Sequence, residues 1–355
     1  VASPTVRARF ARGFAGFREG VVRRRAVLVL ALVSLAVALI VRLPAILWPV
    51  FNWDESTFLA VGRRILQLPY TSTLENKPPL AFVPYALPTL FGIDDLRFAR
   101  LLAALVVAAT GVLLGLIASR RLPVQLATAV VAVVMISVVP GGDAWMTELD
   151  VMFWGSLVAY LTSRILRGRP TSFFWFGLCI GAFPLLRTNW ALVAVMFGIV
   201  GLVAAVRARR WVRFILGGMI PWLIVIGAYV VTGRAGSLVL GAIRIPSSIN
   251  AGSHGDLSLP EGMARMAAVS AALLVAAVIL RIRTAESKLP GILALIGLVL
   301  IVVPAFPEYA DYDHHTLQIV PFLALGVGML MDAVALRTVG RRSAWRILAA
   351  GVSVV

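Results

Sequence analysis

The sequence has 355 residues, of which 60% are hydrophobic and only 14% are charged, and it carries a formal net charge of +17. Apolar runs of about 20 residues recur along the chain, which excludes a soluble globular domain and indicates a polytopic membrane protein. Because the runs are continuous rather than alternating, they favour helices over a β-barrel. The basic residues are scattered over short segments between the runs. That pattern favours topology signals and anionic lipid over nucleic acid as the partner.

The apolar runs predict ten membrane-spanning helices, and the charges between them predict their orientation. Three arginines at 23–25 precede the first run and place the N-terminus in the cytoplasm. We expect a basic cytoplasmic segment at 1–25, a transmembrane catalytic domain at 26–343, and the start of a further, truncated span at 344–355. The predicted spans are 26–47, 97–118, 123–140, 150–166, 172–186, 189–206, 214–232, 263–280, 289–305 and 316–336.

The first predicted outer loop, 48–96, contains two segments that we expect to lie at the membrane surface. Residues 79–92 are apolar but short and contain three prolines. If they crossed the membrane, the next basic loops would lie outside, so we predict an interfacial or re-entrant segment. Residues 55–67 predict a surface helix whose apolar stripe consists of Phe58, Val61, Ile65 and Leu66.

Acidic and basic residues gather in four predicted outer segments. A carboxylate can take a proton from an attacking hydroxyl, and Lys, Arg or His can stabilise a phosphate leaving group as its charge develops. Such residues at a bilayer edge therefore suit the transfer of a water-soluble group from a lipid phosphate. The candidates are Asp54, Glu55, Glu75, Lys77, Glu148, Asp150, Arg187 and His314.

Several of these residues also have an ordinary structural explanation. Asn52 and Glu55 have the spacing of a capping box, so they could simply start the surface helix. Lys77 could be an interfacial anchor. Glu148 and Asp150 could mark the solvated end of a span.

The last outer segment, FPEYADYDHH at 306–315, leaves a metal site open. Asp313, His314 and His315 could form a helix cap and first turn, or could bind a divalent metal ion together with Asp311. Adjacent histidines do not share one helix face, which argues against the metal. The sequence therefore implies no certain cofactor and keeps a divalent metal ion as the alternative.

Five segments, in this order, resemble the GT-C glycosyltransferases that use polyprenyl-phosphate sugars, in the branch of the aminoarabinose transferases and the protein O-mannosyltransferase-like enzymes. WDESTFLAVGRRIL resembles the family's Asp-Glu motif, and ENKPPLAF its Lys-Pro-Pro segment. TELDVMFW is similar to the second acid motif, whose spacing selects Glu148 with Asp150 nearby. FPLLRTNWA resembles a short span ending in a cation, here Arg187, and HHTLQIVPFLAL a His-led motif that selects His314. The resemblance covers most of residues 40–335.

The resemblance implies an all-α, GT-C-like helical bundle with a long first outer loop that carries interfacial helices. It also implies a bacterial inner-membrane location, with the active site facing the periplasm or exterior. The catalytic base, or the acid that positions the acceptor, would be Asp54, with Glu55 beside it. The second acid would be Glu148 or Asp150. The residues expected at the substrate are Lys77, Arg187 and His314 at the lipid phosphate, Arg100 supporting the first loop, and Glu75 in that loop.

The implied reaction is one displacement with inversion at the sugar carbon, from a polyprenyl-phosphate donor to a lipid, glycan or protein acceptor. The acceptor stays open, because this sequence lacks the later spans and soluble domain that some members carry. Two other classes also stay open. A lipid or solute transporter would hold paired charges in its cavity, although the sequence shows no internal repeat of the kind transporters use. A non-catalytic subunit of a cell-envelope assembly is the other.

Overall fold

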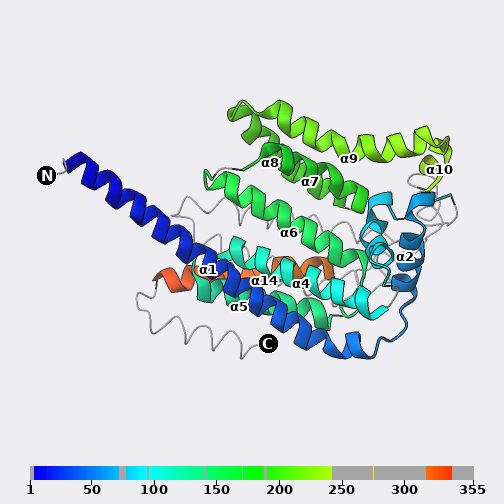
Figure 1. Ribbon diagram of the computed structural model, residues 1–355, viewed down its shortest axis with the longest axis horizontal. Helices are drawn as coiled ribbons and strands as arrows, with labels where there is room; N and C mark the ends of the chain where they lie inside the picture. Colours follow the sequence, from blue (N-terminus) through cyan, green and yellow to red (C-terminus); the bar gives the residue numbers. More distant parts are fainter. Residues whose placement is uncertain are drawn as a thin grey trace.

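The computed structural model describes residues 4–71, 77–93, 96–139, 141–169, 171–187, 190–241, 275 and 317–337. Within these ranges every regular element is a helix (Figure 1), which confirms the all-α class there. Five helices are long and apolar enough to cross a membrane, as expected of a polytopic membrane protein. They are Arg24–Leu47, Leu96–Ala118, Thr147–Leu166, Trp211–Val231 and Leu317–Ala335.

Eight of the ten predicted spans fall on described helices. The predicted spans 263–280 and 289–305 lie outside the described residues, apart from residue 275, and so does 344–355. The eight helices are α1 (Pro4–Leu47), α4 (Leu96–Ala118), α5 (Leu122–Val138), α6 (Thr147–Leu166), α7 (Phe173–Leu186), α8 (Ala191–Arg207), α9 (Trp211–Val231) and α14 (Val320–Arg337). A short helix, α10 (Ala235–Val239), follows α9.

The starts of α1 and α6 differ from the sequence-based expectation. Helix α1 begins at Pro4 and so runs through the segment that we expected to precede the first span. Helix α6 begins at Thr147, not at residue 150, so Glu148 and Asp150 lie in its first turn. Acidic side chains are favourable there because they face the positive end of the helix dipole.

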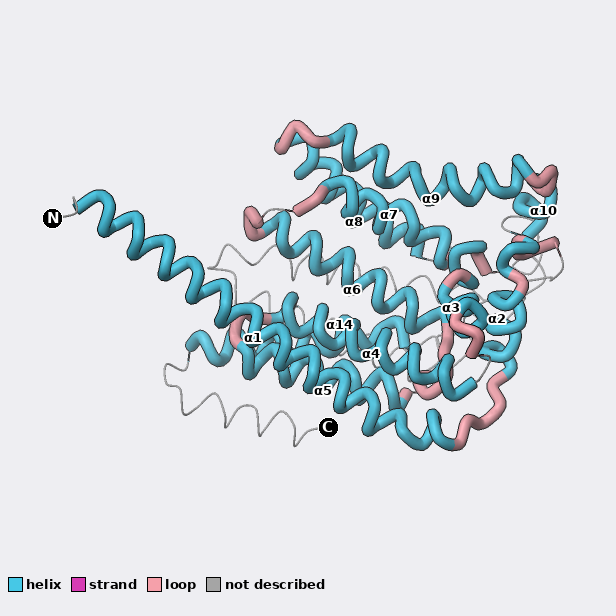
Figure 2. Tube along the Cα trace, in the orientation of Figure 1, coloured by secondary structure: helices cyan, strands magenta, loops and turns pink. Residues whose placement is uncertain are grey.

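The described part of the predicted first outer loop, 48–96, folds into short helical pieces at one end of the bundle. The expected surface helix is α2 (Trp53–Arg63), followed by the 3-10 turn η1 (Ile65–Gln67). The proline-rich stretch forms three short turns, η2 (Pro79–Phe82), η3 (Pro84–Ala86) and α3 (Leu87–Leu90). These turns pack on α2 (Figure 2): the Phe58 ring lies 5.4 Å from the Tyr85 ring, and a Cβ at Gly62 would lie 2.4 Å from the Tyr85 carbonyl carbon.

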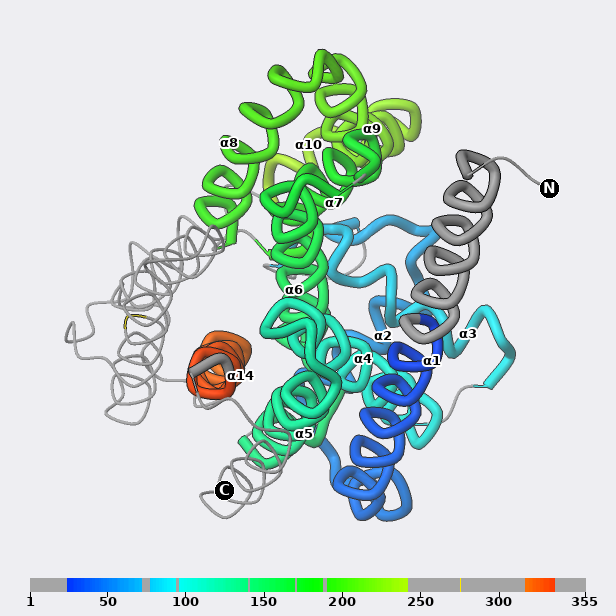
Figure 3. Tube along the Cα trace, turned by 90° about the vertical axis from the view of Figure 1, so that its left-hand side faces the viewer, coloured from blue at the N-terminus to red at the C-terminus, as the bar shows by residue number. Residues whose placement is uncertain are grey.

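Helix α6 separates two groups of helices (Figure 3). Helices α1, α4 and α5 pack together on one side, with α14 against α4 and α5, and α7, α8 and α9 pack together on the other. The N-terminal end of α6 lies at the same end of the bundle as α2 (Figure 1). The acids of the α6 first turn are therefore brought to the first outer loop.

Candidate functional site

The start of α2 separates the roles of Asn52 and Glu55. The Oδ1 atom of Asn52 accepts a hydrogen bond from the backbone N–H of Glu55 at 3.0 Å, so the predicted N-cap is confirmed. The Glu55 side chain does not complete a capping box. It is fully buried, and its Oε2 atom accepts hydrogen bonds from Nε and Nη2 of Arg100 at 3.2 and 2.9 Å.

Arg100 ties α4 to the end of α1 and to the first outer loop. Besides the ion pair with Glu55, Nη1 donates to the carbonyl oxygen of Ala45 at 3.0 Å, and Nη2 donates to that of Val50 at 2.6 Å. The arginine is 1% exposed. Arg100 therefore holds the end of α1 and the start of the first loop against α4.

Trp145, which the sequence analysis did not select, joins the first loop to α6. Its backbone N–H donates to Oε1 of Glu55 at 2.7 Å, and its indole Nε1 donates to Oδ1 of Asp150 at 3.2 Å. Its carbonyl oxygen accepts from the hydroxyl of Tyr85 at 3.1 Å, and the two rings lie 4.7 Å apart. The available signal in the sequence was an aromatic residue inside the short acidic stretch GGDAWMTELD.

Tyr85 contributes a neutral donor to this cluster. Burial, together with the nearby carboxylates of Asp150 and Glu148, raises the pKa of Tyr85 well above its usual range. The phenol therefore keeps the proton that it donates to Trp145.

Glu148 and Arg187 form an ion pair, although Glu148 lies on α6 and Arg187 follows α7. Arg187 directly follows α7, and its Nη1 atom also donates to the Thr147 hydroxyl at 3.0 Å. The Thr147 hydroxyl lies 3.2 Å from Oε2 of Glu148. Glu148 is 1% exposed and Arg187 is 3% exposed, so this second pair is also buried.

The two remaining acids have carboxylate oxygens without a partner among the described residues. Asp150 is buried, and while Trp145 binds its Oδ1 atom, its Oδ2 atom makes no hydrogen bond. Asp54 is half-buried on α2 beside Glu55. Within the part of the chain that the structure describes, the Asp54 side chain makes no hydrogen bond or ion pair.

Lys77 lies at the same end of the bundle as Arg187. The carbonyl oxygen of Lys77 accepts a hydrogen bond from the hydroxyl of Tyr70, and the Lys77 residue is half-buried. Tyr70 and Leu80, on either side of Lys77, pack in one cluster with Leu185, two residues before Arg187. The structure therefore brings the Lys-Pro-Pro segment to the end of α7.

Glu75 and His314 lie outside the described residues, as do Asp311, Asp313 and His315. Gln318, from the same predicted motif as His314, is described. Its Oε1 atom accepts a hydrogen bond from Nε1 of Trp190 at 2.7 Å, which places the start of the last described helix beside the start of α8.

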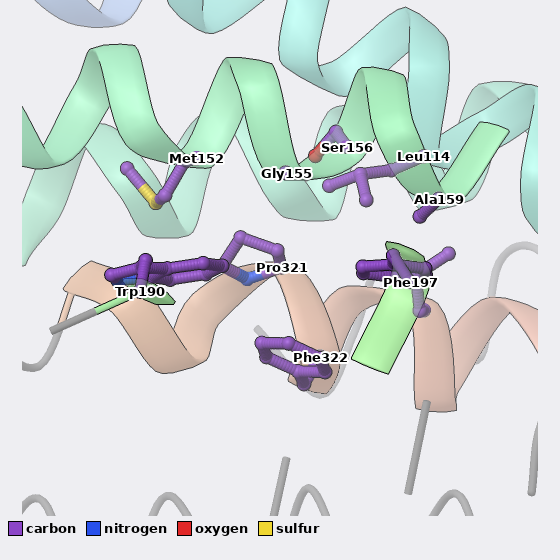
Figure 4. A pocket seen from close by; sticks show the side chains of 10 residues that line it. Leu114, Met152, Gly155, Ser156, Ala159, Trp190, Phe197, Pro321 and Phe322 are labelled. Carbon is purple, nitrogen blue, oxygen red and sulfur yellow. The ribbon is translucent and has the colours of Figure 1, made fainter. Parts of the chain in front are cut away.

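An apolar pocket lies along α6, beyond the acids (Figure 4). Met152 and Ser156 of α6 face Trp190, Phe197 of α8 and Phe322 of α14 across it. The Ser156 hydroxyl is buried and makes no hydrogen bond with the part of the chain that the structure describes.

Within the described ranges, no group of three or more His, Cys, Asp or Glu side chains is placed to hold a metal ion. Comparison with known proteins finds no matching family model, no matching curated protein and no matching solved structure. The function is therefore argued from the site itself.

Proposed function

We propose that this chain is a membrane glycosyltransferase of the GT-C type, which moves a sugar from a polyprenyl-phosphate donor to a lipid, glycan or protein acceptor. The reaction would take place on the periplasmic or exterior face of the bacterial inner membrane. The observation that carries the proposal is the ion pair of Arg187 with Glu148, in the α6 first turn that also carries Asp150, at the end of the bundle that holds Asp54.

The contacts divide the acids between structural and chemical roles. Both carboxylate oxygens of Glu55 are occupied by Arg100 and Trp145, so we assign Glu55 to holding the loop. Asp54 is half-buried and without a partner among the described residues, so its carboxylate can accept a proton. We therefore assign the role of general base to Asp54.

Arg187 is suited to the lipid phosphate because, among the described residues, only one of its nitrogens is occupied. Nη1 bonds to Thr147 and Glu148, while Nε and Nη2 make no hydrogen bond among the described residues. A guanidinium has five N–H donors, and it binds phosphate through charge-assisted hydrogen bonds. Lys77 and His314 would add positive charge to the same phosphate.

The proposed reaction is a single displacement. The oxygen of an acceptor hydroxyl attacks the anomeric carbon of the sugar, and Asp54 receives the hydroxyl proton. The bond from the anomeric carbon to the phosphate oxygen breaks with its electron pair, and the lipid phosphate leaves as an anion. Arg187 stabilises the charge that develops on this phosphate, so no general acid is needed.

The described polar groups argue against a transporter. A transporter binds its substrate near mid-membrane, between broken helices. Here the acids and Arg187 lie at the first turn of α6 and directly after α7, which are helix ends.

The proposal is tested by turnover of the purified protein in lipid bilayers with a panel of radiolabelled polyprenyl-phosphate sugars. Asp54→Asn keeps the shape of the side chain and removes the proton acceptor. We expect its turnover to fall by about 10²–10⁴, as for loss of a general base, with unchanged thermal stability. The matched control, Asn52→Ala, loses the helix cap, so it should be less stable by about 1 kcal/mol and keep its activity. No transfer by the wild type, or normal turnover by Asp54→Asn, would refute the assignment.

A further inference from the structure

Trp145 is the residue through which the first loop and the acids of α6 contact one another. It hydrogen-bonds to three other parts of the fold: Glu55 on α2, Tyr85 on η3 and Asp150 on α6. It is 1% exposed and is among the largest fully buried side chains of the described chain. The backbone N–H and C=O make the first two of these bonds, so only the third, from the indole N–H to Asp150, depends on the tryptophan side chain.

The backbone before Trp145 is held from α1. The guanidinium of Arg42 donates to the carbonyl oxygens of Gly142, Asp143 and Ala144, the last two at 2.9 and 3.2 Å. Gly142 lies so close to the end of α5 that a Cβ would be 1.7 Å from the carbonyl oxygen of Ile136. The loop is therefore held on both sides, which fixes the backbone from which the Trp145 side chain projects.

This indole N–H is the hydrogen-bond donor to the Asp150 carboxylate among the described residues. It binds Oδ1 and leaves Oδ2 buried and without a hydrogen bond. A buried carboxylate oxygen without a donor is unfavourable, and a hydroxyl of a bound ligand would satisfy it. Glu148, two residues earlier, differs because Arg187 and Thr147 contact its carboxylate.

We propose that Trp145 is a positioning residue that orients the Asp150 carboxylate, so that Oδ2 accepts a hydrogen bond from a hydroxyl of the transferred sugar. This inference rests on the proposed glycosyltransferase function and adds to it a residue that sets sugar specificity. A site built to bind a hydroxyl discriminates strongly against an analogue that lacks it, because the buried polar group is then left unpaired.

The experiment uses the donor that the wild-type protein transfers, together with analogues that each lack one sugar hydroxyl. We expect the wild type to discriminate against one analogue by about 10- to 100-fold in kcat/KM, as for a hydrogen bond to a charged group. Trp145→Phe keeps a ring against Tyr85 but removes the indole donor. It should lose most of that discrimination, mainly through a lower kcat for the full donor, which a purely structural role would not cause.

Trp154→Phe is the matched control. Trp154 also lies on α6, and its indole N–H makes no hydrogen bond among the described residues, so this variant should keep both turnover and discrimination. Asp150→Asn removes the carboxylate charge and should lose discrimination as Trp145→Phe does. Because the two residues act as a unit, the double variant should be no worse than either single variant.

The outcomes separate the two proposals. A wild type that transfers no sugar from any donor overturns the proposed function, and this inference with it. An active wild type whose Trp145→Phe variant keeps the full discrimination overturns this inference alone. If the melting temperature shows that Trp145→Phe does not fold, Asp150→Asn decides the question, and its retained discrimination would overturn the inference.

Discussion

At the scale of single residues, Asp54 and Glu55 are neighbours on α2 but lie in different surroundings. Glu55 is fully buried and paired with Arg100, whereas Asp54 is half-buried and has no partner among the described residues. A buried ion pair is costly to desolvate and persists only when hydrogen bonds satisfy its remaining donors and acceptors. Arg100 meets that condition through the carbonyl oxygens of Ala45 and Val50.

We expect Arg100→Lys to destabilise the protein although it keeps the charge. A lysine ammonium cannot reproduce the fork of donors that reaches Glu55, Ala45 and Val50 together. Each buried acceptor left without a donor costs about 1–3 kcal/mol. The melting temperature in bilayers measures this loss. The control is Arg64→Lys, because the exposed Arg64 side chain makes no ion pair in the described ranges, and equal melting temperatures would contradict the prediction.

The raised pKa of Tyr85 predicts how the stability of the fold responds to alkaline pH. Its pKa is raised in the folded state, because burial disfavours the phenolate, while the unfolded chain has a pKa near 10.0. The unfolded state therefore releases the proton first, so the stabilisation is complete below pH 10 and falls as the pH rises above it. Unfolding measured between neutral pH and pH 11 should show this decline, and the decline should be smaller in Tyr85→Phe. An identical pH dependence in the two proteins would rule out this role for Tyr85.

At the scale of elements, α7 and α9 approach each other through glycines. A Cβ at Gly177 would lie 2.0 Å from the carbonyl oxygen of Phe214, and one at Gly181 would lie 2.0 Å from that of Gly218. Gly177 and Gly181 are four residues apart on α7, which is the GxxxG spacing that lets membrane helices pack closely.

We expect Gly181→Ala to separate α7 from α9, because the added methyl group would meet backbone that cannot move alone. Since Arg187 directly follows α7, the shift should also weaken use of the lipid donor. Gly227→Ala, on α9, is the matched control: a Cβ there meets nothing within 4 Å, so the change should be neutral or should stabilise the helix by up to about 1 kcal/mol. Equal melting temperatures for Gly181→Ala and Gly227→Ala would refute the close packing of α7 and α9.

The elements also show what the sequence could predict. The apolar runs located eight described helices, because membrane helices need long apolar segments whatever their neighbours. The start of α6 was predicted too late because Glu148 and Asp150 were interpreted as solvated loop residues. Inside the protein, Arg187 pairs with Glu148, and Trp145 donates a hydrogen bond to one oxygen of Asp150. The sequence alone does not show these pairings. Only the fold joins Glu148 to Arg187, and Glu55 and Trp145 are 90 residues apart. Motif resemblance selected Arg187, but no spacing rule could reveal Trp145.

At the scale of the whole molecule, the bundle has two chemically different ends. The candidate site lies at the end with α2 and α3, while the loops α4–α5, α6–α7 and α8–α9 lie at the opposite end (Figure 2). These three loops carry the arginine clusters at 120–121, 167–169 and 207–210. Basic loops face the cytoplasm, so this distribution supports an outward-facing site.

Single cysteines in a Cys179→Ser background test that orientation. Leu66 is 94% exposed in the middle of η1, and Ile93 is 44% exposed shortly after α3, so both can report on the predicted outer loop. We expect an impermeant thiol reagent to label Leu66→Cys and Ile93→Cys on intact cells, since 79–92 should not cross the membrane. Ala208→Cys, exposed in the α8–α9 loop, should react only after permeabilisation. Labelling at 66 with protection at 93 would mean that the proline-rich turns cross the bilayer. Labelling of Ala208→Cys alone on intact cells would show that the topology is the reverse of the predicted one, and would exclude a site facing the exterior.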